Sequence, residues 1–276
     1  MMELTLGYSP CPNDTYIFHA LSQGVVESPF RLKTLLADVE MLNQQVRQGI
    51  LDISKISVHA LPRVLDRYWL LRSGGAIGKG CGPLVTAKRS VTMEQLRDAK
   101  IAVPGNLTTA HLLLRLHGVH RGQCIPMQFD RIMPAVASDE VDAGVIIHEG
   151  RFTYPSYGLN MVLDLGEWWE SETGLPLPLG AIVIKRDLGP EIARTVEEKI
   201  RESLLFARSN PEAARDYIRQ NAREMEPEVI RRHIETFVND FSLDTGIEGE
   251  NALRRLIGAG CALDNIPFPS EPLFWS

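Results

Sequence analysis

Apolar strand-like runs alternate with helical segments through the first two thirds of the chain, and this alternation constrains the fold most strongly. Parallel strands need a crossover helix between them, so the pattern predicts an α/β protein with largely parallel strands. Beyond Pro190 only helices are expected, and Pro190, Pro211 and Pro227 each suit a first helical turn. Strands are expected at 4–8, 32–36, 52–57, 68–72, 83–87, 100–103, 126–129, 143–148 and 181–185. Helices are expected at 15–23, 41–48, 59–65, 93–98, 109–117, 131–138, 191–208, 211–220, 227–239 and 248–258.

Two pairs of segments share the same organisation, which indicates two similar lobes. Residues 46–58 and 136–148 each combine a helix end, a short turn, an aspartate and a buried strand. Residues 4–18 and 101–113 each combine a strand, a polar loop and a helix that opens with hydroxyl or amide residues. Two open sheets would present the carboxyl ends of their strands to a shared crevice, where α/β proteins bind ligands.

The predicted architecture is therefore a bilobal fold of the periplasmic-binding-protein-like type II class, with two open-sheet lobes around a cleft. Strands 83–87 and 181–185 would carry the chain between the lobes. Lobe one would comprise residues 1–85 and 186–276, and lobe two residues 86–185. Such lobes close on a ligand by hinge motion. A single larger domain is the alternative.

Composition narrows the range of partners. The net charge of −6, without a cluster of Lys and Arg, argues against nucleic-acid binding. No apolar run reaches the length of a membrane span, and the first residues lack the basic region of a signal peptide. We therefore expect a cytoplasmic protein. The four scattered cysteines form no CxxC pair and are expected to be free thiols.

The stiff turn that follows the first strand is the first candidate for ligand binding. Pro10 and Pro12 fix two φ angles, and Asn13 and Asp14 stand where N-capping side chains belong. Such a junction can hold an anion at its free N–H groups, or it can be a capped helix without a ligand. Cys11, between the prolines, is either a nucleophile or a packing residue, and packing is favoured.

The ends of two strands carry further candidates. His148 follows a strand apolar enough to be buried on both faces, and a histidine there can accept a proton near neutral pH. A loop histidine with structural hydrogen bonds is the alternative. Lys55, Ile56 and Ser57 occupy the matching position in the other lobe. Ser57 could donate to a ligand oxygen, and Lys55 is costly in an apolar strand unless it faces a partner or a cleft.

Hydroxyl residues also open the predicted helix 109–117. Thr108, Thr109 and Ala110 would combine side-chain hydroxyls with the free N–H groups of a helix start, a suitable cradle for a carboxylate. Helix capping alone explains the threonines equally well. The glycine-rich run 74–80 is not a phosphate loop, because Gly80 follows Lys79 where Ser or Thr is required. We interpret it as a mobile connection near the hinge.

Four segments together resemble one enzyme family. They are SPCPNDTYIFH at 9–19, DISKIS at 52–57, GNLTTA at 105–110 and IIHE at 146–149. They resemble the 1,4-dihydroxy-6-naphthoate synthases of the futalosine route to menaquinone, and the resemblance extends over essentially the full length.

The resemblance implies a carbon–carbon lyase that converts cyclic dehypoxanthine futalosine to 1,4-dihydroxy-6-naphthoate. His148 would be the proton acceptor. Lys55, Ile56, Ser57, Thr109 and Ala110 would bind substrate, with Ser9, Asn13, Asp14 and Thr108 as further walls of the cleft. The only implied partner is the small-molecule substrate, and no metal or redox cofactor is implied. The oligomeric state and the roles of Glu149 and Cys11 are left open.

Two other functions fit the same residues. Chorismate dehydratase belongs to the same pathway and shares the fold, although the SPCPND motif favours the synthase. A cytosolic protein that binds a small carboxylate is the non-enzymatic alternative. The missing signal peptide argues against transport, and the missing helix-turn-helix argues against a DNA-linked sensor.

Overall fold

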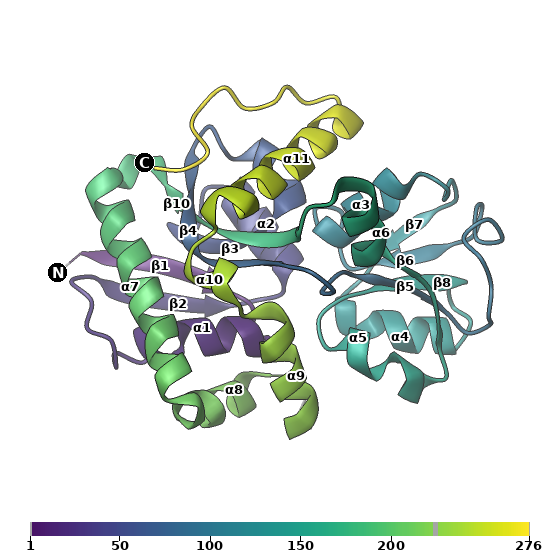
Figure 1. Ribbon diagram of the computed structural model, residues 1–276, viewed down its shortest axis with the longest axis horizontal. Helices are drawn as coiled ribbons and strands as arrows, with labels where there is room; N and C mark the ends of the chain where they lie inside the picture. Colours follow the sequence, from purple (N-terminus) through teal and green to yellow (C-terminus); the bar gives the residue numbers. More distant parts are fainter. Residues whose placement is uncertain (1, 223–225, 276) are drawn as a thin grey trace.

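The structure is a computed structural model that describes residues 2–222 and 226–275. Its described part contains two five-stranded sheets, one on the left of Figure 1 and the other on the right. Each sheet forms the centre of a lobe with helices packed around it. The predicted α/β organisation with two lobes is confirmed.

The first sheet has the strand order β2-β1-β3-β10-β4. Its strands are β1 (Glu3–Tyr8), β2 (Arg31–Leu36), β3 (Ile53–Ser57), β4 (Tyr68–Gly78) and β10 (Leu177–Lys185). Strand β1 runs parallel to β2 and β3, whereas β10 is antiparallel to β3 and β4. The antiparallel strand departs from the expected parallel order because the chain returns through β10 from the second lobe.

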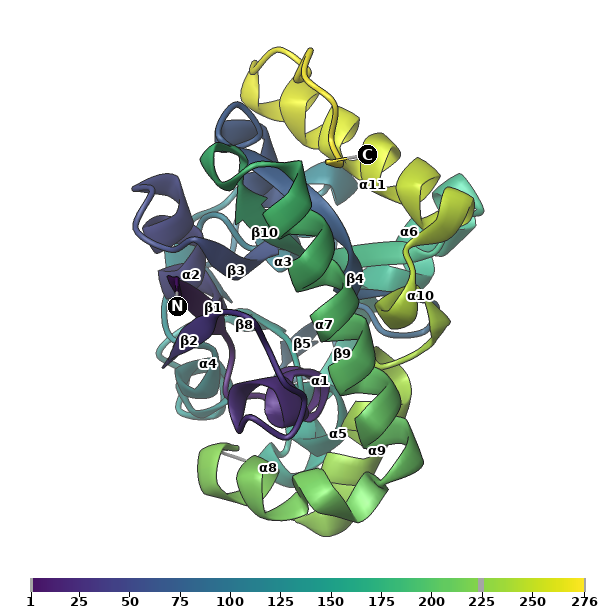
Figure 2. The ribbon, with the colours of Figure 1, turned by 90° about the vertical axis from the view of Figure 1, so that its left-hand side faces the viewer.

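Helices cover both faces of this sheet. On one face lie α1 (Pro12–Ser22) and α7 (Pro190–Ser209), which crosses in front of the sheet in Figure 2. On the other lie α2 (Val39–Arg47), the 3-10 helix η1 (Val58–Arg63) and α11 (Gly246–Asp264). Leu70 and Leu71, neighbours on β4, belong to the two different apolar clusters, as the alternation of a strand requires.

The second sheet has the strand order β7-β6-β8-β5-β9, with β5 antiparallel to β8 and β9. Its strands are β5 (Leu84–Ala87), β6 (Ile101–Val103), β7 (Cys124–Pro126), β8 (Ala143–Ile146) and β9 (Asn160–Asp164). The surrounding helices are α3 (Thr109–His117), α4 (Phe129–Ala137), α5 (Gly150–Thr153), η2 (Tyr154–Tyr157) and α6 (Leu165–Thr173). Ala143 and Val145 pack in the cluster that contains α3, and Ile146 packs in the cluster that contains α4.

The last third of the described chain is helical, as predicted. After η3 (Arg186–Leu188) and α7 come η4 (Pro211–Ala214), α8 (Arg215–Asn221), α9 (Pro227–Phe237), α10 (Asp240–Leu243) and α11. Helix α9 packs against α1, and α10 packs against β4. The C-terminal region therefore returns to lobe one, where it borders the cleft.

Several sequence predictions were wrong in detail. Strand β9 and helix α6 were not predicted, and residues 93–98 form turns instead of a helix. The strand expected at 126–129 lies earlier, at Cys124–Pro126, and Phe129 begins a helix. The glycine-rich run expected as a mobile connection belongs to β4 as far as Gly78. At Gly74 φ is +84°, and a Cβ would approach Ile182 to 2.8 Å, so the glycine permits close pairing with β10.

The lobes are joined by two short passages and a shared core. Strand β5 lies wholly in the second sheet and β10 wholly in the first, so the chain passes between the sheets after Gly78 and before Leu177. One apolar cluster includes residues of both lobes, such as Leu42 and Leu112. Asp264 adds an ionic link, because it accepts from Arg63 of lobe one and Arg115 of α3. The lobe limits at residues 85 and 185 stay a prediction.

Among the described helices, none is both long and apolar enough to cross a membrane.

Candidate active site

A cavity lies between the lobes and contains about 660 Å³ of empty space, part of it open to solvent. Every residue predicted for the site lines it: Ser9, Asn13, Asp14, Lys55, Ile56, Ser57, Thr108, Thr109, Ala110 and His148. The sequence did not single out the other lining residues, which are Val39, Ala76, Cys81, Gly82, Pro83, Ile147, Leu179, Gly180 and Phe237. Segments far apart in the chain therefore line one cavity.

The first turn of α1 contributes a buried carboxylate. Asp14 accepts a hydrogen bond of 2.7 Å from Ser9 Oγ and one of 2.9 Å from Asn13 Nδ2. The ammonium of Lys55, on β3, donates a hydrogen bond of 2.7 Å to Asp14 Oδ1. Lys55 thereby joins the network of the α1 turn. Both side chains of this ion pair are buried. Because the buried ammonium is paired with a carboxylate, a lysine is tolerated in this apolar strand. The pair ties the stiff turn to the end of β3.

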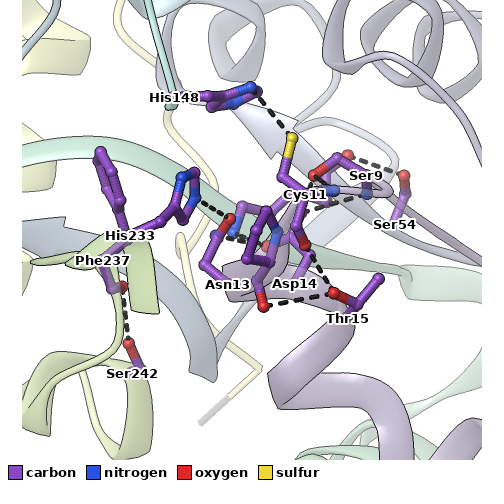
Figure 3. Close-up of polar contacts among 12 residues, drawn as sticks. Ser9, Cys11, Asn13, Asp14, Thr15, Ser54, His148, His233, Phe237 and Ser242 are labelled. Carbon is purple, nitrogen blue, oxygen red and sulfur yellow. Dashed lines mark hydrogen bonds and ion pairs between the residues drawn. The ribbon is translucent and has the colours of Figure 1, made fainter. Parts of the chain in front are cut away.

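His233 extends the network from α9. It is fully buried, and its Nε2–H donates to Asn13 Oδ1 at 2.9 Å (Figure 3). Burial lowers the pKa of His233 well below its usual value, and the nearby His148 and Lys55 lower it further. The imidazole is therefore neutral. His233 was not predicted as a site residue, because its helix looks like an ordinary amphipathic segment.

His148 stands beyond the end of β8, with its backbone in the left-handed region at φ 54°. A non-glycine residue there carries strain, which is common at functional sites. Its ring meets Phe129 edge to face at a centroid distance of 5.1 Å. Burial lowers the pKa of His148 to about 4, with Asp14 raising it and Lys55 lowering it. At neutral pH the ring is uncharged and can accept a proton.

Cys11 is the nearest polar neighbour of that ring. Its Sγ lies 3.1 Å from Nδ1 of His148. Burial raises the pKa of the Cys11 thiol well above its usual value, and the carboxylate of Glu149 raises it further. A protonated thiol is a poor nucleophile. The nucleophile interpretation is therefore disfavoured, and Cys11 acts at this site as a neutral side chain.

Ser57 is prepared to donate a hydrogen bond. Its Oγ accepts a bond of 3.1 Å from Asn43 Nδ2, and its N–H donates to Asn43 Oδ1 at 2.8 Å. Because the hydroxyl already accepts from Asn43, its proton is directed elsewhere, and Ser57 lines the cavity. Asn43 also donates to the carbonyl of Leu107 in the other lobe at 3.4 Å.

The start of α3 faces the same cavity. Thr108 is the N-cap, and its hydroxyl accepts from His111 N at 3.3 Å. A helix leaves its first N–H groups without helical partners, which here are those of Thr109 and Ala110. The Thr109 hydroxyl donates to Leu179 O at 2.6 Å and accepts from Val58 N at 3.0 Å. The Thr109 hydroxyl is therefore already engaged, and the backbone N–H groups are the donors that this helix start leaves toward the cavity.

Beside the ring of His148, the described residues include a group of side chains of the types that ligate metal ions. Ligand-type atoms of Cys11, His148 and Glu149 lie within 4.8 Å of one another. Tetrahedral zinc with its usual bond lengths places such atoms roughly 3.5 Å apart. Cys11 Sγ and His148 Nδ1 are closer than that, in direct contact at 3.1 Å, so these two atoms would have to separate to admit an ion. These residues therefore fit a metal ion poorly.

Comparisons with known proteins identify the family. A sequence profile described as menaquinone biosynthesis matches residues 4–261. A curated protein of Thermus thermophilus, named 1,4-dihydroxy-6-naphthoate synthase, is 50% identical over 99% of this chain and 100% of its own length. A protein of the same name from Streptomyces coelicolor is 43% identical over 96% of this chain and 95% of its own length.

Solved structures agree on the fold. A crystal structure from Archaeoglobus fulgidus superposes with a TM-score of 0.90 at 35% identity, over 96% of this chain and 98% of the other. The ligand-binding component of an ABC import system from Staphylococcus aureus superposes with a TM-score of 0.72 at 11% identity, over 100% and 98% of the two chains. The predicted periplasmic-binding-protein-like fold is thus confirmed. With the profile match and the two curated relatives, this chain belongs to the menaquinone biosynthesis family.

Proposed function

We propose that the chain is a 1,4-dihydroxy-6-naphthoate synthase, a carbon–carbon lyase that acts on cyclic dehypoxanthine futalosine with His148 as general base. Two curated relatives that match nearly the whole chain bear the name of this enzyme. The observation that carries the proposal is the position of His148, a neutral imidazole in the cavity between the lobes. A base for carbon–carbon fragmentation must be unprotonated and within reach of an enclosed substrate.

The carboxylate of the substrate would bind opposite the base. Ser57 offers a hydroxyl proton, and the start of α3 offers the N–H groups of Thr109 and Ala110. A helix start favours negative charge both through these donors and through the helix dipole. The ring would then lie between this cradle and His148.

Fragmentation next to a ketone places negative charge on an oxygen. His148 would remove a hydroxyl proton from the sugar-derived fragment, and that oxygen would become a carbonyl as the adjacent carbon–carbon bond breaks. The electron pair of the broken bond would move onto the ring ketone. Donors already fixed in the site stabilise such an enolate-like oxygen without reorganisation, and Lys55 still has N–H groups beyond its bond to Asp14. Aromatisation of the product favours the step. Closure of the lobes on the substrate would exclude competing water.

Product formation tests the proposal. Purified protein is incubated with cyclic dehypoxanthine futalosine, and the naphthoate is followed by its absorbance and mass. Parallel reactions contain chorismate or an unrelated small carboxylate. Formation of the naphthoate supports the synthase. Dehydration of chorismate without naphthoate formation contradicts it in favour of the sister enzyme, and tight carboxylate binding without turnover contradicts it in favour of a binding protein.

A further inference from the structure

The thiol of Cys11 contacts the ring of His148 across the cleft. Cys11 is the N-cap of α1, yet its side chain makes no capping hydrogen bond to that helix. Instead Sγ lies 3.1 Å from Nδ1 of His148, 137 residues further along the chain (Figure 3). The prolines on either side of Cys11 fix its backbone. The sulfur is therefore held at a defined place beside the ring.

The ring of His148 is held on several sides. The strained backbone at φ 54° sets its direction, and Phe129 packs edge to face against it. His233 lies beyond it, at a centroid distance of 6.1 Å. Within the described residues, the contact with Cys11 is the one hydrogen bond to this ring, and it engages Nδ1. Nε2 is thus the nitrogen left for a ligand in the cavity.

We propose that Cys11 is a positioning residue whose sulfur accepts a hydrogen bond from Nδ1–H of His148, which leaves Nε2 unprotonated and ready to act as the base. This assignment rests on the proposed function, in which His148 takes a proton from the substrate. When Nε2 takes that proton, the ring becomes an imidazolium, and its Nδ1–H keeps the hydrogen bond to the sulfur. The proton later leaves from Nε2, and the thiol keeps its own proton throughout.

A thiol orients the ring without charging it. In many enzymes a carboxylate holds Nδ1–H, and its negative charge stabilises the imidazolium. A neutral sulfur fixes the same tautomer but adds no negative charge, so the half-buried base stays unprotonated. Burial keeps the Cys11 thiol protonated, consistent with this role. The titratable groups around the pair are Asp14 on α1, Asp38 before α2, Lys55 on β3, Glu149 beside His148, and His233 on α9.

The tautomer can be measured on the protein without substrate. In ¹⁵N-histidine-labelled protein at pH 7, we expect His148 to be neutral, with a proton on Nδ1 and none on Nε2. In Cys11→Ala the proton should move to Nε2, and Cys11→Ser should retain the original tautomer in part. Cys81→Ala is the matched control, since Cys81 is also buried and lines the cavity. In the Cys81→Ala variant, the ¹⁵N signals of His148 should equal those of the parent protein.

Steady-state kinetics of the Cys11 variants give a second test of the proposal. If the thiol positions the base, Cys11→Ala lowers kcat about tenfold or more with little change in KM, and Cys11→Ser recovers part of the loss. Cys11→Asp should shift the acid limb of the pH profile upward by at least one unit, because the carboxylate stabilises the imidazolium. A proton on Nε2 of His148 in the parent protein overturns the proposal. The NMR result is independent of turnover, so a parent with the expected tautomer but no naphthoate formation contradicts only the proposed function.

Discussion

The ammonium of Lys55 lies 2.7 Å from the carboxylate of Asp14, and both side chains are buried at the wall of the cavity. This ion pair connects the carboxyl end of β3 to the first turn of α1. Asp14 is further held by Ser9 and Asn13, whose side chains both donate to it. The floor of the site is therefore a polar network fixed before any ligand arrives.

Breaking the pair on one side should be costly. Asp14→Asn leaves the buried Lys55 ammonium without its counter-charge, and we expect a loss of about 3–5 kcal/mol in the free energy of unfolding. Lys55→Met should cost less, because Asp14 retains its bonds from Ser9 and Asn13. Urea unfolding of both single variants and the double variant gives the coupling energy. Strictly additive losses would show that the two charges do not stabilise each other.

Ser57→Ala tests recognition of the substrate. Loss of a buried donor to a carboxylate should weaken binding by about 1–3 kcal/mol and raise KM accordingly. Ser54→Ala is the matched control, because Ser54 is buried on the same strand and donates to the carbonyl of Lys55. Steady-state kinetics of both variants check the expectation. Unchanged KM and kcat in Ser57→Ala would remove Ser57 from the site.

The Thr109 hydroxyl should stabilise the contact between the two lobes. Its hydroxyl connects Leu179 O and Val58 N, so Thr109→Val leaves both groups without that partner. We expect a loss of about 1–3 kcal/mol in stability. Thr109→Ser keeps the hydroxyl and should retain most of it. If Thr109→Val instead unfolds like the parent but loses affinity for substrate, the hydroxyl itself recognises the carboxylate.

The pH dependence of activity follows from the shifted histidine. Burial lowers the pKa of His148 to about 4, and the ring must be unprotonated to act as base. Activity should therefore persist as the pH falls through 6.5, the usual pKa of histidine, and decline only as the pH approaches 4. The kcat/KM profile of the free enzyme measures this, with circular dichroism to show that the protein stays folded. An acid limb near pH 6.5 would contradict the account.

Much of the site was predictable because its parts lie at the ends of recognisable elements. The apolar strand before His148 and the hydroxyl residues at 108–109 mark a strand end and a helix start. In an α/β protein such ends converge on one crevice. Local patterns were therefore enough to place Ser57, Thr109 and His148 around a common cavity.

Contacts between distant segments were not predictable. His233 comes from α9 and reaches Asn13, 220 residues earlier, and no local pattern distinguishes it from an ordinary helical histidine. The pairing of Cys11 with His148 likewise depends on how the lobes meet. Strand β9 is half exposed and lacks a clear alternation, so it escaped detection. The glycine-rich part of β4 was predicted as a loop, because glycine runs are typical of loops. These glycines instead allow close packing against β10, which a single sequence does not reveal.

Replacement of His148 separates proton transfer from substrate binding. His148→Asn keeps a polar side chain of similar size but cannot accept the proton. Turnover of cyclic dehypoxanthine futalosine is measured beside calorimetric binding of the same substrate, for the parent and the variant. We expect turnover to fall at least about a thousandfold, on the order of what loss of a positioned base removes, while the dissociation constant changes by less than about threefold. A variant that retains near-parent turnover would contradict the assignment of His148 as the base.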